Sequence, residues 1–223
     1  MTDSRFVPFG VDRWSMRDLA AGAIPRVAVD SGSKEPLRLY QYRTADAPSG
    51  VAADEMAIAA LKRLCRPYDR LAATFLDRYR AYLGEIVDTN RAMLERKVAP
   101  FDGLYRVEDW IFSAPLPLPR AFLFAPSDAA APSGDESDYV QVEFAFYPGE
   151  HWIAVLLQDG RMTPGKARDR RARLSSCEIT TIDVSSEDLS SSKTFARIVP
   201  ADIVLRGFGP LPVGPGPRIQ FLN

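Results

Sequence analysis

The chain has 223 residues, of which 46% are hydrophobic and 26% are charged, and its formal net charge at pH 7 is -1. This length and hydrophobic content are enough for a substantial core, while the near-zero net charge argues against a surface coated with positive charge for nucleic acid. No apolar run approaches the roughly 18–20 residues that cross a bilayer, and the first residues, MTDSRFVPFG, lack a signal-peptide pattern. We therefore expect a soluble, cytoplasmic protein with no membrane partner.

The cysteine and histidine content argues against several kinds of site. Cys65 and Cys177 are the two cysteines and belong to no CxxC motif, so we expect free thiols rather than a zinc site or a disulfide framework. His151 is the single histidine, and no GxSxG motif accompanies it. We therefore expect His151 to be a structural residue of a turn rather than a catalytic base.

The first part of the chain predicts a short strand and then helices. Residues 1–50 contain scattered glycine and proline, with one run, LRLYQYR at 37–43, that predicts a strand, and we interpret this region as an N-terminal wrap around the core. Residues 51–98 form a helical segment in which Pro67 should end or kink the first helix, because proline lacks an amide hydrogen. We expect a long N-terminal helical hairpin, with helices at 53–66 and 68–97.

Apolar side chains recur on one face of the second expected helix at a spacing close to a heptad. They are Phe75, Tyr79, Tyr82, Ile86 and Met93. A stripe of this kind packs in a core or against a partner helix. We therefore expect it to be buried against the sheet or against a second copy of the chain, which leaves open a homodimer formed through the long helix.

The rest of the chain, residues 99–223, is expected to form an α/β core. Thr163 and Pro164 suit the N-cap and first turn of a helix, and a helix between two strands makes those strands parallel. The expected fold is a single α/β domain over residues 1–223, with a mixed central sheet and flanking helices. The expected strands are 104–112, 139–146, 152–158 and 177–184, and the expected helix of this part is 164–174.

Candidate functional residues lie on consecutive elements of this core. Alternation along the strand 139–146 places Glu143 on the side opposite the apolar residues. The next strand is a continuous apolar run that ends in a Gln-Asp-Gly turn, which suits a central strand. The helix that follows is rich in basic residues, which can pair with phosphates or be solvated on an amphipathic surface. The candidate nucleic-acid-binding residues are Lys166, Arg168, Arg170 and Arg171.

The order YVQVEFAF, IAVLLQDG, KARDRRARL and CEITTIDV resembles the core of the PD-(D/E)XK restriction-endonuclease-like superfamily, particularly its very-short-patch-repair-like branch, over residues of about 139–189. In that branch a strand with an acidic residue precedes a strand with a second carboxylate near an Asp-Gly turn. The resemblance implies a restriction-endonuclease-like core in which Glu143 is the first metal-binding acid. The second acid would fall near Leu156, and the lysine of the family near Gln158. Asp159 on a bulged strand could replace the missing acid, and Glu85 could be a third metal ligand.

Three functions follow from these residues, and the sequence leaves open whether the protein is an enzyme. We favour a catalytically degenerate nuclease-like scaffold that acts as a binding or interaction module, with no cofactor and weak nucleic-acid contact. The reason is that two carboxylates are needed to hold a divalent cation and activate water, and Leu156 and Gln158 do not supply them. The first alternative is an active endonuclease that uses Glu143, Asp159 and Mg²⁺. The second is a helical assembly protein that dimerises.

Overall fold

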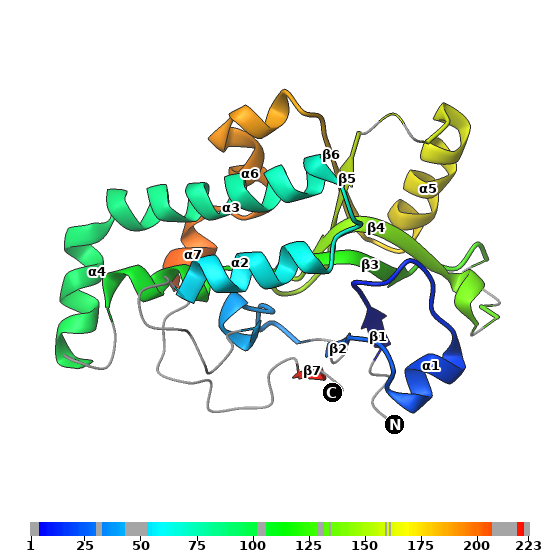
Figure 1. The fold of residues 1–223 in the computed structure, drawn as a ribbon, viewed down its shortest axis with the longest axis horizontal. Coiled ribbons are helices and arrows are strands. Elements are labelled where there is room, and N and C mark those ends of the chain that lie inside the picture. The colour runs from blue at the N-terminus through cyan, green and yellow to red at the C-terminus, as the bar shows by residue number, and fades with distance from the viewer. Residues whose placement is uncertain are drawn as a thin grey trace.

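A computed structural model of the protein describes residues 5–29, 33–42, 53–101, 106–128, 132–133, 135–158, 160, 162–206 and 218–220. It is a mixed α/β structure with two sheets (Figure 1). The larger sheet has four strands in the order β3-β4-β5-β6, and the smaller has three in the order β1-β2-β7. The larger sheet consists of β3 (Leu118–Phe124), β4 (Tyr139–Phe146), β5 (Ile153–Leu157) and β6 (Thr180–Val184). The smaller consists of β1 (Arg5–Pro8), β2 (Arg26–Val29) and β7 (Arg218–Gln220).

The four-stranded sheet confirms the predicted mixed arrangement. β4 is antiparallel to both β3 and β5, whereas β5 and β6 are parallel. The parallel pair is joined by α5 (Pro164–Ser176), which begins at the predicted proline. Every residue of β5 is buried, as expected for an apolar strand with neighbours on both sides.

The helical segment contains three helices between residues 53 and 98, where two were predicted. α2 (Ala53–Arg63) ends before Pro67, and α3 (Arg70–Thr89) begins with Asp69 as its N-cap. The expected helix 68–97 is broken, because α4 (Arg91–Val98) starts anew after Asn90. The Asn90 side chain donates a hydrogen bond to the carbonyl of Ile86, a local bond that competes with the regular helix.

Shorter helices complete the described structure. They are α1 (Met16–Ala21), α6 (Ser192–Ile198), α7 (Ala201–Arg206) and the 3-10 helices η1 (Leu39–Tyr42), η2 (Ala99–Phe101), η3 (Val107–Ser113), η4 (Glu136–Asp138) and η5 (Asp188–Ser190). Among the described helices, none is both long and apolar enough to span a membrane.

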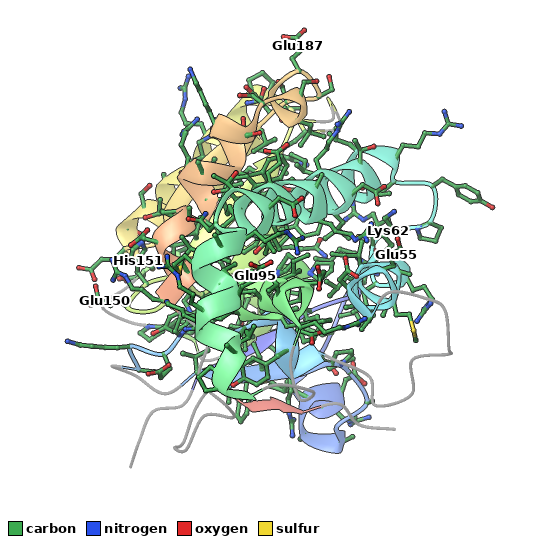
Figure 2. All side chains as sticks on the ribbon, turned by 90° about the vertical axis from the view of Figure 1, so that its left-hand side faces the viewer. Glu55, Lys62, Glu95, Glu150, His151 and Glu187 are labelled. Atoms are coloured by element: carbon green, nitrogen blue, oxygen red, sulfur yellow. The ribbon has the colours of Figure 1, made fainter. Side chains whose placement is uncertain are left out.

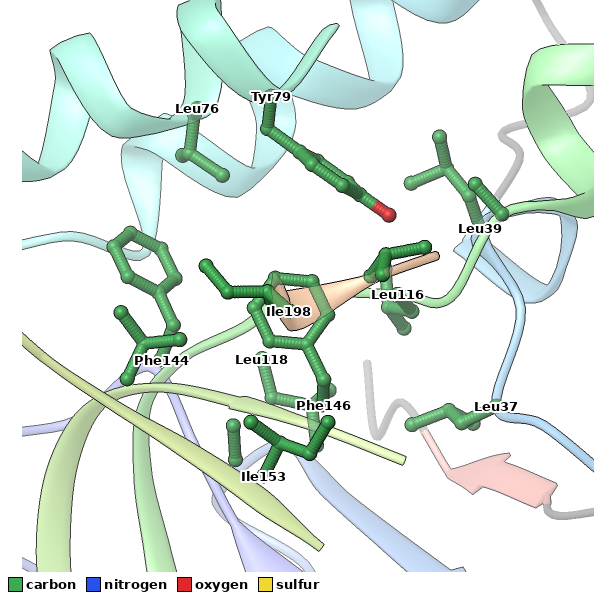
Figure 3. Close-up of a cluster of buried hydrophobic side chains, with 14 of the residues drawn as sticks. Leu37, Leu39, Leu76, Tyr79, Leu116, Leu118, Phe144, Phe146, Ile153 and Ile198 are labelled. Atoms are coloured by element: carbon green, nitrogen blue, oxygen red, sulfur yellow. The ribbon is translucent and has the colours of Figure 1, made fainter. Parts of the chain in front are cut away.

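The apolar face of α3 packs on the four-stranded sheet, and this contact forms the centre of the core (Figure 3). Phe75 stacks on Phe144 of β4 with 4.5 Å between ring centroids, and Tyr79 meets Phe146 edge-on at 5.5 Å. The Tyr79 hydroxyl is buried and donates to the carbonyl of Pro115 at 2.6 Å. Four residues of the predicted stripe, Phe75, Tyr79, Tyr82 and Ile86, are therefore buried, and the first two lie against the sheet of their own chain. The fifth, Met93, lies on α4 and is half-buried.

Two predicted strands are wrong. Residues 104 and 105 of the run at 104–112 lie outside the described residues. The rest of the run leads into η3, where the Trp110 indole donates to the carbonyl of Val204. The first strand of the sheet is instead β3, which contains Pro119. Pro119 is tolerated there because β3 is an edge strand and needs no amide donor at that position.

The run at 37–43 is likewise not a strand in its described part. Leu39 begins η1, and one isolated bridge joins Arg38 to Pro115. Leu39 is fully buried, so its apolar character reflects packing in the core rather than strand pairing. The strands of the N-terminal region are β1 and β2, and their apolar residues belong to the same buried cluster as the four-stranded sheet.

Candidate functional site

The register of the four-stranded sheet places two carboxylates on either side of a leucine. Phe144 lies opposite Val155, so Glu143 on β4 lies opposite Leu156 on β5. Leu156 in turn pairs with Asp183 on β6. Paired residues of neighbouring strands point to the same face, and adjacent strands lie about 4.8 Å apart. The row therefore spans three strands on the face opposite the one that α3 covers.

The α5 helix lies on this second face of the sheet (Figure 1). Its Arg170 holds Glu143 with two parallel hydrogen bonds, from Nη1 to Oε1 at 3.2 Å and from Nη2 to Oε2 at 2.5 Å. The backbone N–H of Leu157 donates to the same Oε2 at 3.2 Å. The Arg170 side chain is only 12% exposed and that of Glu143 29% exposed. Both oxygens of Glu143 are thus engaged by a bidentate arginine, a strong and directional kind of ion pair.

A second arginine–carboxylate ion pair lies at the other end of the row, on β6. Arg171 donates to Asp183 from Nε at 3.0 Å and from Nη2 at 2.8 Å. This pair is more open to solvent, since the two side chains are 39% and 36% exposed. Consecutive arginines of α5 therefore neutralise the two carboxylates of the row.

A cavity of about 510 Å³ lies between α5, the ends of β4 to β6 and the turn that precedes α3. Its lining includes the two ion pairs, Leu156 at the base, and Gln158, Gly160 and Met162 at one edge. Two further basic residues, Arg66 and Lys166, also line it. The lining carries four basic side chains against two carboxylates. We call this space, with its lining residues, the α5 cavity.

The wall opposite α5 is held by a small polar network. Arg66 donates from Nε to Asp12 at 3.0 Å and from Nη2 to the Gln141 side chain at 3.3 Å. Arg120 also pairs with Asp12, at 2.7 Å. The hydrogen bond from Arg66 is the largest cause of a lowered pKa of Asp12, and the charge of Arg120 acts in the same direction. The network ties the turn between α2 and α3 to the loop after β1.

Four of the predicted site residues meet at the α5 cavity, and the others do not. Glu143, Lys166, Arg170 and Arg171 line it. Arg168 is exposed on α5 and is not part of the lining. Glu85 lies on α3, which covers the opposite face of the sheet, and it accepts a hydrogen bond from Ser192 at 2.8 Å.

Glu85 as a third metal ligand is therefore a prediction that the geometry does not support. Asp159 lies outside the described residues. Within the described residues, no group of three or more histidine, cysteine or acidic side chains is placed to hold a metal ion. His151 is exposed in the turn before β5, at the surface beside Glu150 (Figure 2). Cys65 is buried and Cys177 is half-buried, and both are free thiols.

Sequence reasoning missed three residues that shape the site. Asp183 could have been found, because it alternates with the buried Ile182 and Val184 on β6. Arg66 carries no local signal, since its role depends on how the turn before α3 folds over the sheet. Arg173 was not singled out in the sequence, and it donates to the carbonyls of Ala125 and Ser137, which attaches the end of α5 to the β3–β4 connection.

Comparisons of the chain with protein-family models, with curated proteins and with solved structures give no match. The carboxylates of the site are paired with arginines, its base is apolar, and its remaining polar lining is basic or amide. Such a lining suits an anionic group better than a metal cation.

Proposed function

We propose that the protein is a binding module built on a nuclease-like scaffold whose catalytic site is degenerate, and that its α5 cavity binds backbone phosphates of nucleic acid. The order of elements supports the scaffold. A strand with an acidic residue, β4, is followed by a buried strand, an arginine-rich helix and a parallel strand. This is the order on which the resemblance to the PD-(D/E)XK superfamily rests.

The observation that carries the proposal is the clamp of Arg170 on Glu143. A divalent cation needs free carboxylate oxygens, and a nuclease needs the ion to polarise a phosphoryl group and activate water. Both oxygens of Glu143 accept hydrogen bonds from Arg170 or Leu157. Its neighbour across the sheet is Leu156, which has no ligand atom. These contacts favour a structural role for Glu143.

The basic residues of the α5 cavity supply the proposed phosphate contact. Lys166 is exposed and has no charged partner within the described residues, so its ammonium group is available to an incoming anion. Binding of this kind releases counterions from the nucleic acid and weakens as salt rises. With few contacts and a net charge of -1, the affinity should be modest.

The first test is cleavage of duplex and single-stranded DNA and RNA with Mg²⁺ or Mn²⁺. We expect no turnover by the native chain, because one clamped carboxylate cannot organise the metal. Glu143→Ala and Asp159→Ala are assayed beside it. Cleavage by the native chain that is lost in both variants would contradict the proposal and support the endonuclease, with Mg²⁺ as its cofactor.

The second test compares two basic residues of α5 that lie two positions apart. We expect Lys166→Ala to weaken nucleic-acid binding several-fold and to lower the slope of log K against log salt by about 0.9 for duplex DNA, which corresponds to one phosphate contact. Arg168→Ala is the matched control, because Arg168 is exposed but does not line the α5 cavity. Fluorescence anisotropy measured over a range of salt concentrations gives both quantities. An effect of Arg168→Ala as large as that of Lys166→Ala would place the contact elsewhere.

Assembly through the long helix has less support. The apolar stripe of α3 on which a homodimer would rest is packed against the sheet of the same chain, so it is not available to a second copy. The cytoplasmic location and the absence of a cofactor stay predictions.

A further inference from the structure

Tyr68 is unusual in its exposure and in its backbone. It lies in the turn between α2 and α3, and its side chain is among the few large hydrophobic groups that are exposed, at 97%. Its φ is 64°, in the left-handed region that glycine or asparagine adopts easily and that a bulky residue rarely adopts. The chain thus holds a strained residue with its aromatic ring in solvent.

The turn around Tyr68 is firmly held. Pro67 fixes one backbone angle, the N–H of Asp69 donates to the carbonyl of Arg66 at 3.1 Å, and the Asp69 side chain caps α3 by accepting from Ala72 at 3.0 Å. An apolar residue just before an N-cap usually packs on the first turn of its helix. Tyr68 is too exposed to make such a contact, so packing of its own side chain does not offset the strain. Outliers of this kind concentrate at functional sites.

The turn that carries Tyr68 is rich in arginine. Arg63, Arg66 and Arg70 are all exposed in the same turn or at the adjoining helix ends. Arg66, two residues from Tyr68, forms the wall of the α5 cavity that faces α5. Tyr68 is thus an exposed aromatic residue in an arginine-rich turn, one arginine of which lines the α5 cavity. Aromatic rings among basic residues are the means by which proteins hold single-stranded nucleic acid.

We propose that Tyr68 is a stacking platform for an unpaired nucleobase, and that the module therefore prefers single-stranded nucleic acid. The inference rests on the proposed function, because the phosphates of the same strand occupy the α5 cavity. A base in a duplex already stacks on its neighbours and offers no free face. Tyr68 thus contributes to the binding of single strands and not to the binding of duplexes.

The test is fluorescence anisotropy with labelled oligothymidylate, labelled oligouridylate and a duplex of equal length. We expect Tyr68→Ala to weaken binding of the single strands about tenfold, to leave duplex binding unchanged, and to leave the salt slope unchanged because stacking is not ionic. Tyr68→Phe keeps the ring and should bind as the native chain does. Comparing oligothymidylate (DNA) with oligouridylate (RNA) shows whether the protein prefers DNA or RNA single strands.

A second variant separates stacking from backbone strain. Tyr68→Asn removes the ring but suits the left-handed conformation, so it should melt no lower than the native chain and still lose single-strand affinity. Native affinity in Tyr68→Ala and Tyr68→Asn, with a loss only in Lys166→Ala, would overturn the stacking role and leave the proposed function standing. An equal loss on single strands and duplexes would also overturn it. If the native chain binds neither single strands nor the duplex, the proposed function is contradicted and so is the stacking role of Tyr68.

Discussion

Replacing Phe75 by alanine is expected to lower the free energy of unfolding by about 3–5 kcal/mol, the range for truncating a large buried aromatic side chain. Phe75 is fully buried, and its ring contacts Phe144, Phe146 and Phe195. The truncation therefore leaves a cavity at the contact between α3 and the sheet. Chemical denaturation measures the loss from the shift in midpoint at constant slope.

Arg78→Ala is the matched control for this prediction. Arg78 lies on the same helix and is exposed, so its replacement should change the free energy of unfolding by less than about 0.5 kcal/mol. Equal and small effects of the two substitutions would mean that α3 does not pack on the sheet through Phe75, and the description of the core would be wrong.

The second large effect is expected at the clamp on Glu143. Arg170→Met should lower the free energy of unfolding by about 2 kcal/mol, less than the roughly 3–5 kcal/mol for a fully buried broken pair, because Glu143 is 29% exposed. The loss arises because the carboxylate keeps only the Leu157 N–H as a partner. Glu143→Gln combined with Arg170→Met should recover part of it, since no charge is then left without compensation.

Arg171→Met is the control for the clamp, because it breaks the neighbouring but more exposed pair with Asp183. We expect a loss of at most about 1 kcal/mol. Denaturation of the native chain, Arg170→Met, Glu143→Gln and the double variant gives a double-mutant cycle for the Glu143–Arg170 pair. A coupling energy near zero would show that the pair is incidental and would remove the main support for a structural role of Glu143.

Local patterns were enough to predict the second half of the four-stranded sheet. Strand alternation located β4, a continuous apolar run located β5, and Pro164 marked the start of α5. These signals work because each depends on side chains within one element. The same logic predicted that Phe75 and Tyr79 are buried, and it left open whether the sheet or a second copy buries them.

Predictions failed where tertiary contacts decide the local structure. Trp110 suits a strand by composition, yet its indole N–H reaches the carbonyl of Val204 from a 3-10 helix. Pro119 argues against a strand, yet it is accommodated at a sheet edge. Within the site, the basic residues of α5 could be predicted from the sequence as candidate binding residues. Their pairing with Glu143 and Asp183 could not, because it depends on the register of three strands.

The three-stranded sheet affects the order in which strands can pair during synthesis. β2 pairs with β1 on one side and with β7 on the other, and β7 is made long after both. The strands β3 to β6 follow one another closely in the chain, so they can pair while synthesis continues. β1 and β2 are synthesised before β3 to β6. The edge of β2 that does not pair with β1 stays unpaired until residues 218–220 have been synthesised.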